Sequence, residues 1–278
     1  MSLPIYDDHL HLSPSGRNID ALREFKAEGG TGLTLVTLPY PEVMISEGDD
    51  FERSFDITLD FARRGKELGL KIYTAVGPYP ILMMSLAEHV GLERAEAIMM
   101  RGMDIAASMV EDGRADLIGE VGRPHFDAPS EIVDACNRVL QHGMDLAHDI
   151  GCAVMIHCES EDGTDGNLAS MARSSGLDPR MVIKHSSPPW VTPEETHGIT
   201  PSIPASRKLI REALSKGRNF MMETDFIDDP QRPTSIMAVN TVPKRIKGLF
   251  ASGELDEEDV YRMCQDMPDS LYGIHSRH

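Results

Sequence analysis

Four histidines and two carboxylates occur where short apolar segments end, and their residue types are those of metal ligands. In chain order they are His9 and His11 in DDHLH, Glu120 in IGEVG, His157 in MIHCE, His185 in IKHSS and Asp225 in METDF. Residues two apart on a strand point to the same face, so His9 and His11 can enter one site together. Imidazole and carboxylate ligands suit Zn²⁺ or a similar ion, and this set has room for two ions that share a carboxylate. A bound metal of this kind lowers the pKa of a bound water from 15.7 to roughly 7 and so supplies a nucleophile at neutral pH.

Each of these residues has an ordinary structural explanation when it is considered alone. A single histidine at the end of a strand usually forms structural hydrogen bonds, and Glu120 in its Gly-flanked turn resembles an ordinary loop carboxylate. Burying so many ionisable groups in one place without a cation would be costly. The combination therefore predicts a site for one or two divalent ions. We expect Zn²⁺ first, with Mn²⁺, Fe²⁺, Mg²⁺ and Ni²⁺ as alternatives.

The candidate ligands depend on a regular alternation of strands and helices. Eight β-branched or apolar segments are predicted as strands, at residues 5–9, 32–38, 71–76, 116–121, 153–157, 181–185, 199–203 and 219–224. Apolar residues recur at helical spacing in the segments 20–28, 51–68, 93–111, 130–150, 166–174 and 206–215. Strands that alternate with helices form parallel sheets, because each crossover needs such a connection.

Eight strands of this kind favour a (β/α)8 TIM barrel of the α/β class, formed by one domain over residues 1–278. The alternative, a doubly wound open sheet, would favour a Gly-rich phosphate turn after an early strand, whereas HLHLSPSGR follows the first one. Barrel active sites form at the carboxyl ends of the strands, where the candidate ligands occur. The connection 186–198 between strands six and seven is too short and Pro-rich for a full helix, so we expect one helical turn at 193–196. Segments 243–249 and 256–267 are predicted to complete the outer helical layer.

Composition limits the classes of partner. The chain has 27 Lys and Arg against 45 Asp and Glu, a formal net charge of −18. This balance opposes binding to nucleic acid and anionic membranes, so we expect a small-molecule substrate. The longest apolar runs, near 33–38 and 153–156, are far below the roughly 18 residues of a membrane span. Four cysteines without a CxxC pair and a start without a signal-peptide pattern predict a cytoplasmic protein.

The order of these motifs resembles that of the TatD-type metal-dependent hydrolases of the amidohydrolase superfamily. The similarity consists of HxH on strand one, GE-x-G after strand four, IH on strand five, a histidine on strand six and ETD after strand eight. It covers essentially the whole chain. The segments AVGPYP, IGEVGRPHF and KHSSP depart from the family pattern, and these departures affect the expected substrate rather than the metal site.

The resemblance implies a role for each ligand. One ion would be held by His9, His11 and Asp225, and a second by His157 and His185, with Glu120 shared between the two. Asp225 would also accept a proton from the attacking water, so Asp225 and Glu120 are the expected catalytic residues.

The resulting hypothesis is a metal-dependent hydrolase that cleaves a phosphodiester or amide bond. Two alternatives remain open, a TatD-like deoxyribonuclease and a non-catalytic metal-binding barrel. Arg123 and His125 follow Glu120 and could reach an anionic substrate group or lie in a solvated loop. Asp228 and Asp229 are expected to be solvated loop residues.

Overall fold

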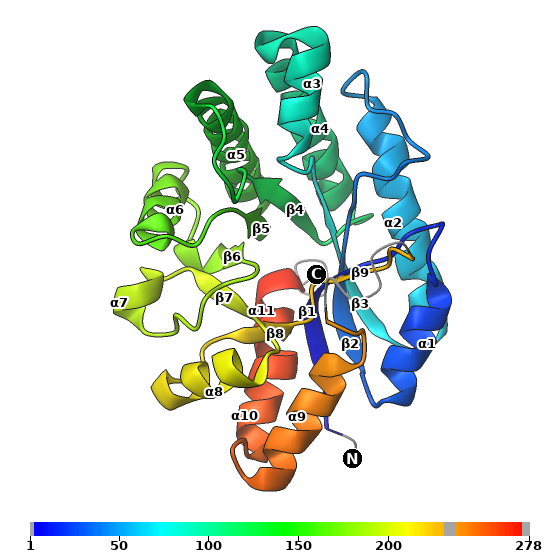
Figure 1. Cartoon of the computed structure of the whole chain (residues 1–278), viewed down its shortest axis with the longest axis vertical. Helices are drawn as coiled ribbons and strands as arrows, with labels where there is room; N and C mark the ends of the chain where they lie inside the picture. Colours follow the sequence, from blue (N-terminus) through cyan, green and yellow to red (C-terminus); the bar gives the residue numbers. More distant parts are fainter. Residues whose placement is uncertain (1–2, 231–236, 274–278) are drawn as a thin grey trace.

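The computed structural model describes residues 3–230 and 237–273 (Figure 1). In this part of the chain nine parallel strands form one sheet in the order β8-β7-β6-β5-β4-β3-β2-β1-β9. Their bounds are β1 Tyr6–His11, β2 Gly32–Val36, β3 Lys71–Val76, β4 Leu117–Gly122, β5 Val154–His157, β6 Val182–Lys184, β7 Thr200–Pro204, β8 Met221–Glu223 and β9 Phe226–Ile227. The first eight correspond to the predicted strands, which confirms the α/β barrel-type fold.

The sheet turns back on itself where β8 passes into β9. β9 begins three residues after β8 ends and pairs with β1, Leu10 opposite Phe226. Between them, the Asp225 amide donates to the His9 carbonyl (3.0 Å), and the Thr224 amide donates to the Asp7 carboxylate (2.9 Å). The last strand is therefore held against the first, and residues from opposite ends of the sequence meet at one site.

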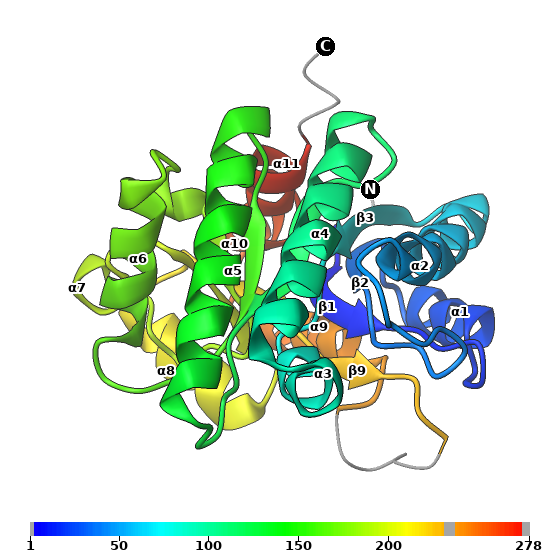
Figure 2. The same ribbon diagram turned by 90° about the horizontal axis from the view of Figure 1, so that it is seen from above.

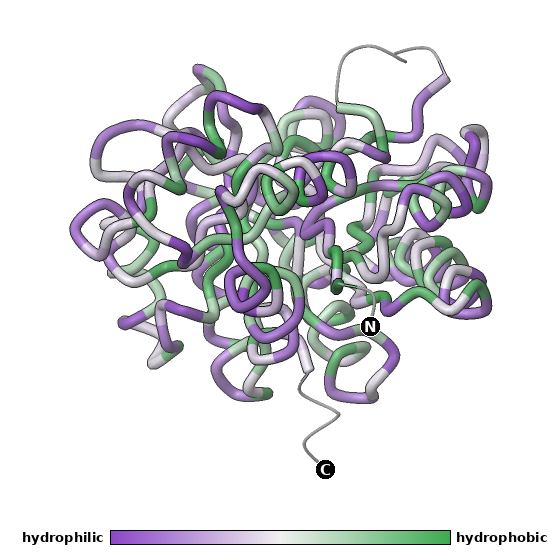
Figure 3. The backbone as a smooth tube through the Cα atoms, turned by 90° about the horizontal axis from the view of Figure 1, so that it is seen from below, coloured by the Kyte–Doolittle hydropathy of each residue, from purple (hydrophilic) through white to green (hydrophobic). Residues whose placement is uncertain are grey.

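Most of the helices surround the strands in sequence order, and the view from above shows several of them in front of the sheet (Figure 2). Their bounds are α1 Ile19–Ala27, α2 Asp50–Glu67, α3 Leu82–Val90, α4 Leu92–Glu111, α5 Ser130–Ile150, α6 Thr164–Ser174, α7 Pro193–Thr196, α8 Arg207–Lys216, α9 Thr241–Ser252, α10 Glu257–Tyr261 and α11 Met267–Tyr272. Hydrophobic and hydrophilic stretches alternate along these helices because each buries one face against the sheet (Figure 3). No helix in the described ranges is long and apolar enough to cross a membrane.

The connection between β6 and β7 is short, as predicted. It holds only α7, a four-residue helix. Thr192 and Glu195 form a capping box at its start, and Pro193 occupies its first turn. The irregular connection therefore has a defined local structure of its own.

Besides β9, two helical parts of the fold were not predicted. α3 precedes α4, separated from it by Gly91 with φ 83°, so the β3–β4 connection carries two helices. After α10, a π-helical turn at Arg262–Asp266 leads into α11, which extends the C-terminal helical segment beyond the predicted end at residue 267.

The end of α11, which lies beyond the predicted segment 256–267, covers the starts of strands. The Tyr272 hydroxyl donates to Asp8 (2.8 Å), and Asp269 contacts Lys71 and the Tyr73 hydroxyl at the start of β3. The opposite, carboxyl ends of the strands remain available for the site.

Candidate metal centre

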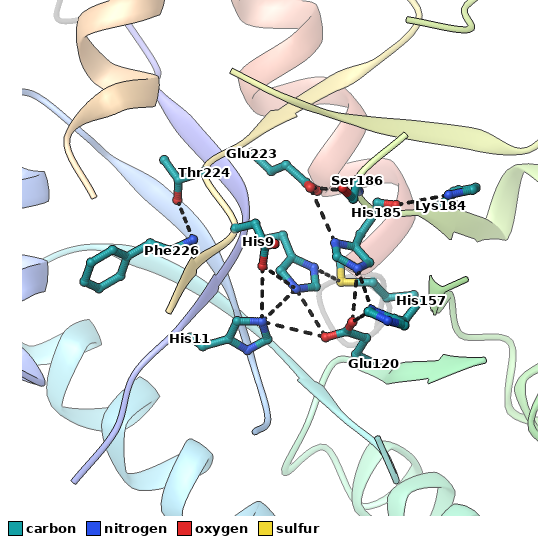
Figure 4. A network of polar contacts seen from close by, with 12 residues as sticks. His9, His11, Glu120, His157, Lys184, His185, Ser186, Glu223, Thr224 and Phe226 are labelled. Atoms are coloured by element: carbon teal, nitrogen blue, oxygen red, sulfur yellow. Dashed lines mark hydrogen bonds and ion pairs between the residues drawn. The ribbon is translucent and has the colours of Figure 1, made fainter. Parts of the chain in front are cut away.

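The six predicted ligands come together at the carboxyl ends of β1, β4, β5, β6 and β8. Five of them are labelled in Figure 4, where the side chains point toward one another. Their donor atoms form three overlapping groups, His9–His185–Asp225, His9–His11–Glu120 and Glu120–His157–His185, each with its atoms within 4.8 Å of one another. All are buried except Asp225, whose side chain is 31% exposed. A substrate could thus approach from the side of Asp225.

Glu120 lies between two groups of histidines and presents one oxygen to each. Its Oε2 is 3.4 Å from His9 Nε2 and 3.7 Å from His11 Nε2. Its Oε1 contacts His157 Nδ1 and is 3.0 Å from His185 Nε2. Two donor groups that share a carboxylate match the geometry of a two-metal site.

Asp225 completes the group on the β1 side. Its Oδ1 lies 3.6 Å from His11 Nε2 and 3.9 Å from His9 Nε2. Its backbone has φ 48°, a conformation that Asp tolerates better than most residues. The preceding Thr224 donates its amide and hydroxyl to Asp7 (2.9 and 2.8 Å), which fixes the turn that carries Asp225.

Glycines on both sides of Glu120 allow β4 to approach β5. A Cβ at Gly122, with φ 139°, would lie 2.1 Å from the carbonyl oxygen of His157. A Cβ at Gly119, with φ 155°, would lie 2.7 Å from Cβ of Met155. The GE-x-G motif therefore has a steric cause, because only glycine lets the strand that carries Glu120 pack so closely against the strand that carries His157.

Contacts outside the ligand set orient two of the imidazoles. His11 Nδ1 lies 2.9 Å from the Val36 carbonyl, which can only accept, so Nδ1 donates to it and Nε2 faces the site. Glu223 Oε1 lies 3.4 Å from His185 Nδ1 on the far side of that ring. Such partners fix the tautomer and the ring orientation of metal-binding histidines.

The sequence interpretation did not consider Asp7 or Glu223. Both are fully buried, and Glu223 accepts the Ser186 amide at 2.8 Å. Burial raises the pKa of Asp7 to about 8 despite its hydrogen bonds from Thr224. The signal was present in DDHLH and METDF, where an acidic residue lies two positions before a ligand, on the same face of the strand.

The electrostatics of the site couple Glu120 to the histidines. Burial alone would raise the pKa of Glu120, but His185 and His157 outweigh it and hold that pKa well below its usual range. Burial would lower the pKa of His185, but Glu120 and Glu223 outweigh it and raise that pKa well above its usual value. Burial and the neighbouring His185 lower the pKa of His9.

The donor set fits a cation better than a network of hydrogen bonds. His9 Nε2 and His11 Nε2 are 3.0 Å apart, as are His157 Nδ1 and His185 Nε2. His11 Nε2 also faces two carboxylates, which raise the pKa of His11 although burial lowers it. Imidazole nitrogens and carboxylate oxygens that converge at this spacing are donor types that a divalent ion takes in place of protons.

The Arg123 side chain is engaged by neighbouring side chains rather than lying in a solvated loop. Its guanidinium donates to Glu159 (2.7–3.1 Å) and to the side chains of Asn137 and Asn167 (2.9 Å each), and the residue is buried. His125 lies next to the site, with Nδ1 2.7 Å from His157 Nε2. Of the two side chains, that of His125 contacts the ring of a predicted ligand, whereas Arg123 contacts His157 through its backbone amide, which donates to the His157 carbonyl (2.9 Å).

Asp228 corrects the sequence expectation, because it is buried rather than solvated. It is 3% exposed, and its carboxylate accepts the backbone amides of Arg17 (2.8 Å) and Asn18 (2.6 Å). The cause is the turn at 13–18, where these two amides have no partner in a strand and donate to the Asp228 carboxylate instead. Asp228 therefore ties the β1–α1 loop to the segment after β9.

A cavity of about 450 Å³ adjoins the ligand set. Leu38, Pro39, Tyr40, Tyr79 and Ile227 form much of its wall, and the Tyr79 ring lies edge-on to His157 with centroids 5.2 Å apart. The volume is in the range of small-molecule sites.

Comparisons with known proteins agree with this geometry. Residues 6–273 match the family described as TatD related DNase. An uncharacterised protein of Methanocaldococcus jannaschii is 33% identical over 278 residues, 98% of this chain and 97% of the relative.

Two solved structures share the fold. The TatD homologue YjjV of Escherichia coli aligns with a TM-score of 0.68 at 15% identity, covering 98% of this chain and 99% of that chain. An organophosphorus hydrolase from Deinococcus radiodurans aligns with a TM-score of 0.62 at 17% identity, covering 98% and 93%. The family match, which spans residues 6–273, shows that the chain belongs to the TatD related DNase family.

Proposed function

We propose that this protein is a metal-dependent hydrolase with two divalent ions at the barrel mouth. The observation that carries the proposal is the position of Glu120, whose two oxygens face separate histidine pairs. His9, His11 and Asp225 would hold one ion, His157 and His185 the other, and Glu120 both. We expect Zn²⁺ first, because imidazole dominates the ligand set.

The ions and Asp225 would have different roles in hydrolysis. When bound, the ions supply Lewis acidity, which polarises the scissile group and makes water more acidic. Asp225 is the most exposed of the six residues, and its carboxylate would accept the proton from the attacking water. Burial raises the pKa of Asp225, but the hydrogen bond with His11 and the nearby His185 and His9 outweigh it. The pKa of Asp225 therefore lies below its usual value. The carboxylate is therefore ionised and able to take a proton at neutral pH.

The bond would be a phosphodiester or an amide, and deoxyribonuclease activity is the second candidate. The description of the matched family favours it. The formal charge of −18 and the engagement of Arg123 by Glu159 oppose it, since affinity for DNA depends on cationic contacts with phosphate.

Metal content tests the proposal. Protein purified without chelator or a nickel column should contain about two transition ions per chain by elemental analysis. His157→Ala and His185→Ala should each lose one ion and most activity while the fold persists, because both residues lie at strand ends above the packed layers of the barrel. Unchanged metal content in both variants would refute their assignment as ligands. Two tightly held ions without turnover on phosphoester and amide substrates would favour the non-catalytic barrel.

A further inference from the structure

Two residues in the wall of the cavity contact predicted ligands, one on each side of Glu120. Tyr79 packs edge-on against His157, on the β5 side. Ile227 pairs with His11 in the β1–β9 ladder, on the β1 side. A group in this cavity would therefore lie next to both ligand groups.

The wall of the cavity is largely apolar. Leu38, Pro39, Pro41 and Ile227 contribute aliphatic surface, and Tyr40 and Tyr79 contribute aromatic rings. The Tyr40 hydroxyl is 2.8 Å from Thr58 Oγ1, so its polar atom already has a partner. Burial raises the pKa of Tyr40 to about 12, and this side chain is uncharged at neutral pH.

No Lys or Arg belongs to the cavity wall among the residues that the structure describes. Its charged residues are both acidic, Asp228 and Asp229. Arg17, the cationic residue of the adjoining loop 13–18, forms an ion pair with Glu24 at 2.6 Å. An anionic group in this cavity would lose part of its hydration, and the described wall offers it no Lys or Arg in return.

We propose that this cavity binds an uncharged, mainly apolar group of a small substrate while the scissile bond lies at the metal centre. This inference rests on the proposed hydrolase function and specifies its substrate class. A volume of about 450 Å³ accommodates a substituted ring or a short aliphatic chain. The flanking phosphates of a polynucleotide strand are the groups that this wall excludes.

Three aromatic probes that are poor metal ligands test the charge preference in the metal-loaded protein. Benzyl alcohol, benzenesulfonate and benzyltrimethylammonium share a ring and differ in charge. Their affinities can be measured by saturation-transfer NMR and by calorimetric titration. Benzyl alcohol should bind about tenfold more tightly than benzenesulfonate, because burying an unpaired anion is costly. Tighter binding of either charged probe would overturn the proposal.

Variants locate the binding in the cavity. Leu38→Lys places a cation in the wall and should reverse the order, so that benzenesulfonate binds better than benzyl alcohol. Met44→Lys adds the same charge to the same β2–α2 connection at a side chain that is 82% exposed, and should leave all three affinities unchanged. Leu38→Gln should weaken benzyl alcohol without improving benzenesulfonate. Equal effects of Leu38→Lys and Met44→Lys would show that the probes bind elsewhere and would overturn the proposal.

Failure of this inference is distinguishable from failure of the proposed function. The probe affinities do not depend on turnover, whereas the function is tested by metal content and by the His157 and His185 variants. If Leu38→Lys does not fold, the order of the three probes in the unaltered protein still decides the charge preference. Retained metal with a preference for benzenesulfonate would contradict only the cavity assignment.

Discussion

Asp225 and Asp228 are three residues apart in METDFIDD and have different surroundings. Asp225 faces His9 and His11 and remains partly exposed. Asp228 is buried against the backbone amides of the loop 13–18. One carboxylate can therefore serve chemistry, whereas the other holds the chain together.

Asp225→Asn should separate metal binding from proton transfer. The amide keeps the shape and one ligating oxygen, but it cannot accept the proton of the attacking water. We expect most of the metal to remain and the turnover number to fall by roughly 100-fold or more, the usual scale for a positioned acid or base. Elemental analysis and steady-state kinetics on the same preparation check this prediction. An Asp225→Asn protein with full activity would remove the residue from its assigned role.

Asp228→Asn is the matched variant and should affect folding instead. In the native protein the amides of Arg17 and Asn18 donate to the Asp228 carboxylate, and in the variant one of them would face an NH₂ group that cannot accept. The variant should therefore lose about 1–3 kcal/mol of unfolding free energy. Metal content per folded chain should stay unchanged. Urea denaturation with parallel elemental analysis measures both quantities. Loss of metal without loss of stability would instead identify Asp228 as part of the centre.

Asp165 offers a test of pH dependence away from the metal centre. It is 2% exposed, neither carboxylate oxygen has a hydrogen-bond partner among the described residues, and burial raises its pKa to about 6. The folded state thus binds the proton of the Asp165 carboxyl more tightly than the unfolded state does. The stability that the protonated carboxyl contributes is fully present below about pH 4 and is lost as the pH rises to about 6.

Asp165→Asn should therefore be more stable than the unaltered protein at pH 8, by about 1–3 kcal/mol, with the difference disappearing near pH 4. Urea denaturation across this pH range measures the effect. Asp162→Asn alters an exposed neighbour and should show no such trend. A constant difference at all pH values would mean that titration of Asp165 is not the cause.

At the scale of elements, the sequence predicted the strands and helices that are defined by residues within the element or next to it. Runs of apolar residues indicated eight strands, and the 193–196 turn was predicted at its observed bounds because Pro193 and the Thr192 cap define it within four residues. β9 was missed because two residues carry no periodicity, and this strand exists only through its pairing with β1. Tertiary contacts of this kind leave no local pattern.

The same distinction applies to the site. The convergence of the six candidate ligands could be expected because they lie at the ends of five strands, and strand ends in a barrel converge. The partners Asp7 and Glu223 and the cavity wall were not, since their roles depend on which loops meet at the barrel mouth. Tyr79 in AVGPYP illustrates this, because only the course of the segment after β3 brings its ring to His157 at the end of β5.

Gly122→Ala tests whether the approach of β4 to β5 positions Glu120. The added methyl would clash with the His157 carbonyl, and φ 139° is unfavourable for any L side chain. We expect a loss of roughly 2–5 kcal/mol in unfolding free energy and reduced metal content. Gly151→Ala, at φ 72° with no atom within 4 Å, is the control and should cost about 1 kcal/mol without metal loss. Full metal content in Gly122→Ala would show that metal binding does not depend on the close approach of β4 to β5.

At the scale of the whole molecule, net charge opposes the substrate that the family description names. A chain with a formal charge of −18 repels a polyanion at a distance, and the ion pair of Arg123 with Glu159 neutralises a cation beside the site. Long-range repulsion of this kind is screened by salt, whose Debye length falls from about 30 Å at 0.01 M to about 8 Å at 0.15 M.

The sign of the salt effect on DNA therefore discriminates between the two functions. A nuclease that holds DNA through Lys and Arg releases counterions on binding, so its affinity falls steeply as salt rises. Here repulsion dominates, so we expect no retention of DNA in filter binding at 0.05 M salt and no increase in nicking as salt is lowered from 0.2 M. The metal-loaded protein is needed in both assays, because the bound ions themselves add positive charge at the mouth. Tight binding that weakens with a slope of several counterions per protein would place cationic contacts along the DNA path and make the deoxyribonuclease the better assignment.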